Sequence, residues 1–309
     1  MPVDPSTLST FDRVGYFLSN AILRGVIGGA CLLPYRWRVP MIGRLISTLS
    51  PLIGWSKRIS DNLRLARPDL SEAEIKALCR SVPDNAGRTV IEIYSGQDFI
   101  DRGVQAPIRG DGLKALEEAR DAGRPVILIT AHFGNYDAAR AKLFSLGFEL
   151  GGLYRRMANP YFNDHYVSKI KQLGEPLFEQ GRRGMTQMVR YLRRGGIIAI
   201  VADLHVHGGE ELTFFGQPAV TSVLNAELAL KYNAVIIPIY AIRQPNGLDF
   251  EVVMNAPIPH SDPITMTQAL NDDLEALVRD HMDQWFWIHR RWKPWFHKGL
   301  QPKAEVTQD

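Results

Sequence analysis

The chain has 309 residues, of which 45% are hydrophobic and 22% are charged, and its formal net charge is +3. This length and balance allow a substantial buried core, which excludes a disordered chain and a small disulfide-stapled domain. Cys31 and Cys79 are the only cysteines, too few for a disulfide framework and not in metal-ligand spacing. We therefore expect a reduced protein that faces the cytosol.

The amino-terminal part of the chain is strongly cationic. Nine lysines and arginines lie between Arg13 and Arg67, where Asp61 is the only acid, and large apolar residues alternate with these bases. This pattern favours a segment on the surface of an anionic bilayer. Arg24 interrupts residues 14–34, so no unbroken apolar run reaches the roughly 18 residues of a spanning helix. An interfacial helix is favoured over a single span that tolerates Arg24 and over a core helix.

Apolar residues recur at helical spacing over residues 41–53, and Ser71 followed by acidic residues predicts the start of another helix. We place a membrane-associating segment at residues 1–40 and a catalytic domain at residues 41–300. Residues 301–309 are polar and are expected to form a disordered tail.

The centre of the chain alternates between short apolar runs and helical patterns. The runs at residues 125–130, 197–201, 234–240 and 250–254 read as strands, and residues 138–146 and 185–192 read as helices. This order predicts an α/β fold with a mainly parallel central sheet flanked by helices. No glycine-rich phosphate loop is found in the sequence, so we expect no nucleotide cofactor.

The segment from His132 to Asp137 follows the first predicted strand, and ligands bind beyond the carboxyl ends of strands in such sheets. The Gly134-Asn135 break would keep His132 on a loop while Asp137 projects from the first turn of a helix. A carboxylate bonded to one imidazole nitrogen would free the other to accept a proton from an alcohol. The alternative is structural, with Asn135 capping the helix, Asp137 facing the helix dipole and His132 in a loop.

Six blocks in order resemble the late acyltransferases of lipid A biosynthesis, over roughly residues 12–297. The first is His-Phe-Gly-Asn-Tyr-Asp at residues 132–137, which is similar to the histidine, four residues, acidic residue motif of membrane acyltransferases. The others are residues 153–160, Asp203, residues 214–216, residues 238–243 and the tryptophan, histidine, double-arginine ending at residues 287–293.

The resemblance implies a fold like that of glycerolphosphate acyltransferases and transfer of a fatty acyl chain from acyl carrier protein or CoA thioester to a lipid hydroxyl. His132 would be the general base and Asp137 its orienting acid, with Asn135 or nearby backbone N–H groups stabilising the oxyanion. Arg155 and Asp203 would hold the acceptor. The thioester is a co-substrate, so no bound cofactor is expected, and neither is nucleic acid. The location implied is the cytoplasmic face of a bacterial inner membrane.

Two positions depart from the family pattern. Arg156 stands where the family usually has proline, and Leu204 stands where a polar residue is common. Both lie in segments expected to face the acceptor headgroup, and Arg156 joins Arg155 as a candidate for binding its phosphates or carboxylates. A lipid A precursor is the favoured acceptor, and a lyso-aminolipid or lysophospholipid is the alternative.

Three further features have competing interpretations. The basic residues of 182–194 favour either docking of an acidic acyl carrier protein or binding to the bilayer, and an exposed face without function is an equal alternative. Asp203, His205 and His207 could ligate zinc with His132, which would indicate a zinc-dependent lipid hydrolase, but we expect no metal. The aromatic residues between Trp285 and Phe296 suit core or membrane-edge packing, or the wall of an acyl-chain channel.

Overall fold

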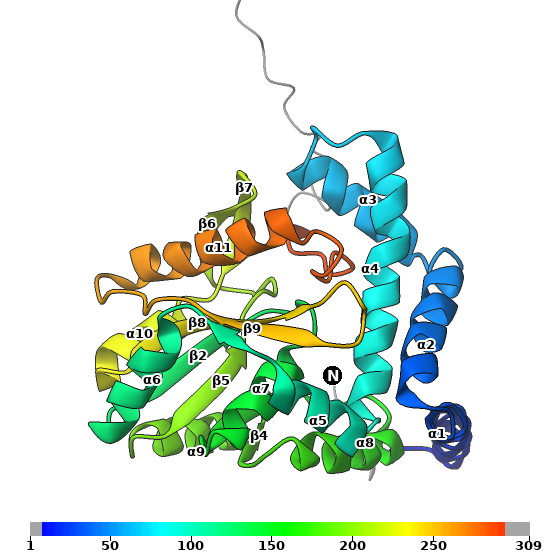
Figure 1. The fold of residues 1–309 in the computed structure, drawn as a ribbon, viewed down its shortest axis with the longest axis horizontal. Helices are drawn as coiled ribbons and strands as arrows, with labels where there is room; N and C mark the ends of the chain where they lie inside the picture. The colour runs from blue at the N-terminus through cyan, green and yellow to red at the C-terminus, as the bar shows by residue number, and fades with distance from the viewer. Residues whose placement is uncertain (1–7, 294–309) are drawn as a thin grey trace, which may run out of the picture.

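The computed structural model describes residues 8–293 of the chain. Its main sheet has seven strands, and the central ones run parallel (Figure 1). From one edge to the other the order is β1 (Ile108–Arg109), β9 (Phe250–Met254), β8 (Val235–Arg243), β2 (Val126–Thr130), β5 (Ile197–Val201), β3 (Leu150–Tyr154) and β4 (Leu177–Glu179). Strand β9 is antiparallel to β8, and β1 is parallel to β9.

Two shorter strands, β6 (Glu210–Phe214) and β7 (Gln217–Thr221), form an antiparallel hairpin apart from the main sheet. The remaining elements are helices. They are α1 (Thr10–Cys31), α2 (Tyr35–Leu49), α3 (Trp55–Ala66), α4 (Glu72–Ile93), α5 (Gln97–Gln105), α6 (Gly112–Asp121), α7 (Tyr136–Ser145), α8 (Pro160–Gln172), α9 (Arg182–Leu192), α10 (Leu224–Tyr232) and α11 (Pro263–Asp280).

Strand β2 is buried along its whole length because helices cover both faces of the sheet. Successive side chains of a strand point to opposite faces. Val126 and Leu128 accordingly belong to one core with apolar residues of α5, α6 and α7, while Ile127 and Ile129 belong to a second core with α9, α10 and α11. The continuous apolar run that predicted a doubly covered strand is thereby explained, and the predicted α/β class is confirmed.

The four strands predicted from apolar runs are all present, as β2, β5, β8 and β9. The structure adds β1, β3 and β4, whose short segments are only partly apolar, and the hairpin β6–β7. The predicted helices are also present, although the expected boundary at residue 40 falls within α2. The predicted tail at residues 301–309 lies outside the described residues.

A third core packs at the end of the sheet where the parallel strands finish. It joins apolar residues of α3, α4 and α11 to the hairpin and to the segment that follows α11. Trp285, Trp287 and Trp292 are fully buried in it and contact one another, with ring centroids 4.6–6.2 Å apart. For these three residues core packing is confirmed, whereas Trp295 and Phe296 lie outside the described residues.

The amino-terminal helices pack against the outside of this body. Helices α2 and α4 approach closely at Gly43 and Gly87, where an added Cβ would come within 2.7–2.9 Å of the opposite helix. Helix α1 is largely exposed, which contradicts the core-helix interpretation. Among the described helices it alone is long and apolar enough to cross a membrane, by length and composition.

Candidate functional site

The site lies where β2 and β5 end side by side. These strands pair in parallel with Thr130 opposite Val201, so two residues further along each strand His132 comes opposite Asp203. Nδ1 of His132 lies 2.8 Å from Oδ1 of Asp203, and the backbone N–H of His132 donates to Oδ2 at 3.0 Å. The side chain of Asp203 is buried, while that of His132 is 29% exposed.

Asp203 is held from a second side by Trp285, whose indole N–H donates to Oδ2 at 2.9 Å. Burial raises the pKa of Asp203, but the charge of His132 and these hydrogen bonds outweigh it and hold the pKa below its usual range. For His132, burial lowers the pKa, and the charge of Asp203 reverses the sign and raises it. The pair therefore favours an imidazolium bonded to a carboxylate.

The predicted bond between His132 and Asp137 is wrong in this structure. Among the described residues, no hydrogen bond or ion pair joins their side chains: Nδ1 of His132 pairs with Asp203, and Asp137 and Asp203 line separate cavities. Asp137 instead lines a small cavity of about 70 Å³ with Thr130, Tyr136 and apolar residues of the sheet. Burial raises its pKa to about 6, and nearby Arg140 acts in the opposite direction.

Asn135 is fully buried and its amide has two structural partners. Its Oδ1 accepts from the backbone N–H of Asp137 at 3.1 Å, which caps α7, and its Nδ2 donates to Glu92 at 2.8 Å. The capping role named as the alternative is thus confirmed. The predicted role of Asn135 in binding substrate is not supported by this geometry.

A buried ion pair between α4 and β8 anchors the loop that carries His132. Both terminal nitrogens of the Arg243 guanidinium, Nη1 and Nη2, donate to the carboxylate of Glu92, and one of these bonds measures 2.8 Å. The neighbouring Thr89 donates to the backbone oxygen of Gly134 at 2.8 Å. Gly134 has φ +52°, and a side chain there would collide with the backbone oxygen of Ala241.

Two more aromatic groups border His132. The ring of Phe286 lies 6.2 Å from the imidazole, and the ring of His289 lies 4.8 Å from it. Burial lowers the pKa of His289 to about 4, and the charge of His132 adds to this effect. His289 is therefore neutral near pH 7, and its buried Nε2 has no hydrogen-bond partner among the residues that the structure describes.

Arg155 and Arg156 follow the carboxyl end of β3. Arg155 is exposed and Arg156 is half-buried. Neither forms an ion pair with any described residue, so both guanidinium groups are available to an anionic ligand. Arg291, by contrast, is buried and donates to the backbone oxygen of Val220 and the hydroxyl of Thr221. It therefore braces the hairpin.

The metal interpretation finds no ligand set. Within residues 8–293 no three histidine, cysteine or acidic side chains are grouped closely enough to hold a metal ion. The ring centroids of His205 and His207 are 5.4 Å apart, and the carboxylate of Asp203 is hydrogen-bonded to His132.

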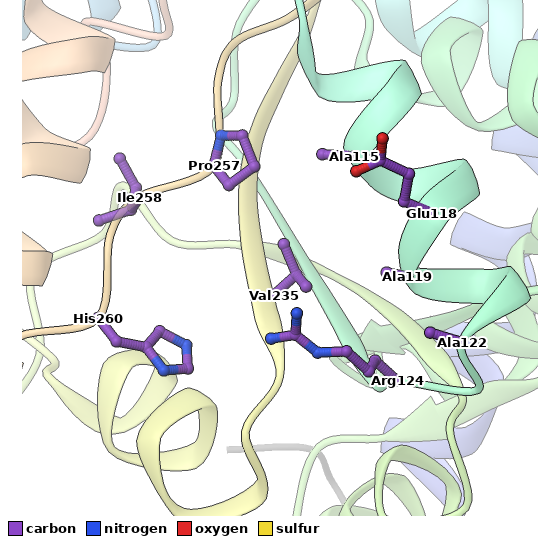
Figure 2. A pocket seen from close by; sticks show the side chains of 9 residues that line it. All are labelled: Ala115, Glu118, Ala119, Ala122, Arg124, Val235, Pro257, Ile258 and His260. Atoms are coloured by element: carbon purple, nitrogen blue, oxygen red, sulfur yellow. The ribbon is translucent and has the colours of Figure 1, made fainter.

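A larger cavity of about 370 Å³ lies at the opposite end of the sheet, where the parallel strands β2 and β8 begin (Figure 2). Arg124, just before β2, and Val235, at the start of β8, line it together with His260. It is therefore separate from the His132 site.

Sequence reasoning missed three of these contacts. The pairing of His132 with Asp203 depends on β2 and β5 being neighbours, although β3 and β4 lie between them in the chain. The roles of Glu92 and Trp285 depend on contacts across 43 and 82 positions. The only available signal was that Asp203, like His132, follows a predicted strand.

We expect replacement of Glu92 by glutamine to destabilise the protein by about 3–5 kcal/mol, because Arg243 would keep a buried charge without its partner. Chemical denaturation measures this difference. Glu118→Gln is the control, since Glu118 is exposed and its contact with Lys114 is 3.9 Å long, so a change below about 0.5 kcal/mol is expected. Equal stability of the two variants would contradict the anchoring role of Glu92.

We expect Asp203→Asn to lower the pKa of His132, because burial then acts without the opposing carboxylate. Nuclear magnetic resonance of labelled histidine side chains follows this titration. Asp137→Asn should leave the pKa of His132 nearly unchanged. If only the Asp137 variant shifts it, the pairing seen here is not the one in solution.

Comparisons with known proteins agree with the family resemblance. Residues 6–294 match the model of the bacterial lipid A biosynthesis acyltransferase family. The lipid A biosynthesis lauroyltransferase of Escherichia coli is 24% identical over 281 residues, which cover 87% of this chain and 89% of that protein. A phosphatidylinositol mannoside acyltransferase of Mycobacterium tuberculosis is 25% identical over 185 residues, covering 59% of this chain and 58% of that protein.

Among solved structures, the 1-acyl-sn-glycerophosphate acyltransferase PlsC of Thermotoga maritima covers 81% of this chain and 99% of its own, with a TM-score of 0.36 and 9% sequence identity. The family match spans all of the described residues, including both partners of the His132–Asp203 pair. The chain therefore belongs to the bacterial lipid A biosynthesis acyltransferase family.

Proposed function

We propose that this protein transfers a fatty acyl chain from an acyl carrier protein thioester to a hydroxyl group of a lipid A precursor. The partly exposed imidazole of His132, bonded through Nδ1 to a buried carboxylate, is the observation that carries the proposal. Membership of the family supplies the reaction class and the kind of acceptor. The place of action is the cytoplasmic face of a bacterial inner membrane, with α1 as the membrane attachment.

In this mechanism Nε2 of His132 takes the proton of the acceptor hydroxyl as its oxygen attacks the thioester carbonyl. Asp203 holds the imidazole in the tautomer whose Nε2 is free and stabilises the imidazolium that forms. The tetrahedral intermediate then expels the thiolate, which receives the proton from His132. No covalent bond to the protein is required.

The oxyanion of that intermediate needs hydrogen-bond donors. Because the amide of Asn135 is engaged, we assign this task to backbone N–H groups at the start of α7, whose positive end begins four residues after His132. We assign Arg155 and Arg156 to binding the phosphates of the acceptor, because neither guanidinium pairs with an acid among the described residues.

The motif implies a catalytic role for Asp137, and because no bond joins it to His132, we assign that role to the cavity that Asp137 lines with Thr130 and Tyr136. Its raised pKa, near 6, means that a large fraction of the carboxyl groups is protonated in weakly acidic solution. This separates Asp137 from Asp203, whose pKa is low and which stays ionised.

We expect His132→Ala and Asp203→Asn each to lower kcat by about a hundredfold or more while the protein stays folded, because the base or its orientation is lost. Activity of the wild type should rise with pH through the raised pKa of His132, since only the neutral imidazole accepts a proton. In Asp203→Asn the acidic limb of kcat/KM should move to lower pH. Turnover kinetics across pH, with far-ultraviolet circular dichroism as the folding control, measure these effects.

Asp137→Asn is the matched comparison, expected to lower turnover without moving the acidic limb of kcat/KM. Wild-type turnover in both His132→Ala and Asp203→Asn would remove the proposed mechanism.

The acceptor is tested by mass spectrometry of lipids from a strain that lacks the protein. Loss of one acyl chain from lipid A supports the proposal. An accumulating lyso-lipid favours the alternative acceptor class, for which the mannoside acyltransferase relative and the departures at Arg156 and Leu204 are the specific observations. Parallel assays with acyl carrier protein and CoA thioesters identify the donor.

A further inference from the structure

Large apolar side chains are exposed mainly at one end of the chain. Of the twenty that are exposed among the described residues, fourteen lie between Phe11 and Ile53. Eight belong to α1 and the turn after it. The other six, on α2 and the turn that leads to α3, are Trp37, Met41, Leu45, Leu49, Leu52 and Ile53.

Helix α2 carries apolar side chains both on the face that packs against α4 and on the face turned away from it. Its inner face, with Val39 and Ile42 buried, packs against α4. On its outer face Trp37, Met41, Leu45 and Leu49 follow one another at every fourth position, so they form one exposed row. A helix on the surface of a soluble body would carry polar residues in that row.

The turn from α2 to α3 continues this surface. Leu52 is 83% exposed and Ile53 is 52% exposed, although both side chains are purely apolar. The next large residue, Trp55, has its ring 6.0 Å from that of Phe286, which in turn borders the imidazole of His132. An apolar path therefore leads from the outer turn to the reactive histidine.

The charge of this surface has one sign. No acidic residue occurs from Tyr35 to Gly54, whereas Arg36 and Arg44 are exposed beside the apolar row. Arg36 lies over the ring of Trp37 at 5.4 Å. Cationic groups that flank aromatic and aliphatic side chains match a bilayer with anionic headgroups better than they match water or a neutral protein surface.

The orientation of the helices fits the same partner. Figure 1 looks along the axis of α1, while α2 runs in the plane of the picture. The two helices therefore point in different directions, so α2 does not run alongside α1 if α1 crosses the bilayer.

We propose that the outer face of α2 and the α2–α3 turn lie on an anionic lipid surface and form a second membrane contact beside α1. This contact fixes how the body is turned on the bilayer and brings the Trp55–Phe286 side of the site to the lipid. The proposal goes beyond the acyl transfer described above and does not depend on the identity of the acceptor.

The first test places an environment-sensitive nitrobenzoxadiazole probe on a single cysteine, with Cys31 and Cys79 replaced by alanine in the full chain. The cysteine replaces Leu45 in one protein and Leu52 in another, and Leu146→Cys is the control, because Leu146 is an exposed leucine at the far end of α7. On vesicles of phosphatidylethanolamine and phosphatidylglycerol we expect a blue shift at positions 45 and 52, quenching by spin-labelled lipid, and neither change at position 146.

An unshifted probe at positions 45 and 52 of vesicle-bound protein overturns the proposal. A blue shift that appears without vesicles and grows with protein concentration also overturns it, because a second copy of the chain would then cover the face. Since the readout is spectroscopic, it stays informative if the reaction assigned above proves wrong.

The second test uses the paired replacements Leu52→Glu and Ile53→Glu. With acceptor embedded in vesicles we expect activity to fall about tenfold or more, since the loss of two inserted side chains and two new negative charges weaken lipid contact. With acceptor dispersed in detergent micelles, activity should stay within about twofold, because neither residue contacts the site. Ile264→Glu, at an exposed isoleucine on α11, is the control, and equal losses in vesicles and micelles contradict the proposal.

Discussion

The whole site depends on the parallel pairing of β2 with β5. That register brings His132 opposite Asp203, two residues beyond the last paired positions of both strands. A shift of one residue would turn these side chains to opposite faces of the sheet. The register is held by apolar side chains of β2 and β5 in the cores on both faces, so packing in the interior determines the geometry at the edge.

The loop after β2 is buried except for part of His132, and it is strongly constrained. Glu92 and Arg243 are buried and paired, and through Asn135 they reach the first turn of α7. Removing one partner of such a pair is costly because the other charge stays buried. Burial of charge therefore fixes the loop in one conformation, which leaves the imidazole of His132 with a defined direction.

The same body joins two kinds of surface. Phe286, in the segment that follows α11, lies beside His132, and the amino-terminal helices carry exposed apolar side chains. Trp55 and Phe286 connect the two regions through ring contacts. Under the proposed function, this continuity would let a lipid acceptor approach His132 from the bilayer.

The sequence alone determined the elements with strong local signals. Continuous apolar runs predicted β2, β5, β8 and β9, and the six ordered blocks indicated the family and with it the reaction class. The same reasoning chose Asp137 as the partner of His132 because residues 132–137 match the histidine, four residues, acidic residue motif and the Gly134-Asn135 break would bring the two side chains together.

Only the tertiary structure decided that Asp203 is that partner. It also showed that Asn135 bonds to Glu92 and that Trp285 donates a hydrogen bond to Asp203. The physical reason is that strand order and burial bring together residues from 43 to 82 positions apart, and no local pattern of side chains encodes which strands become neighbours.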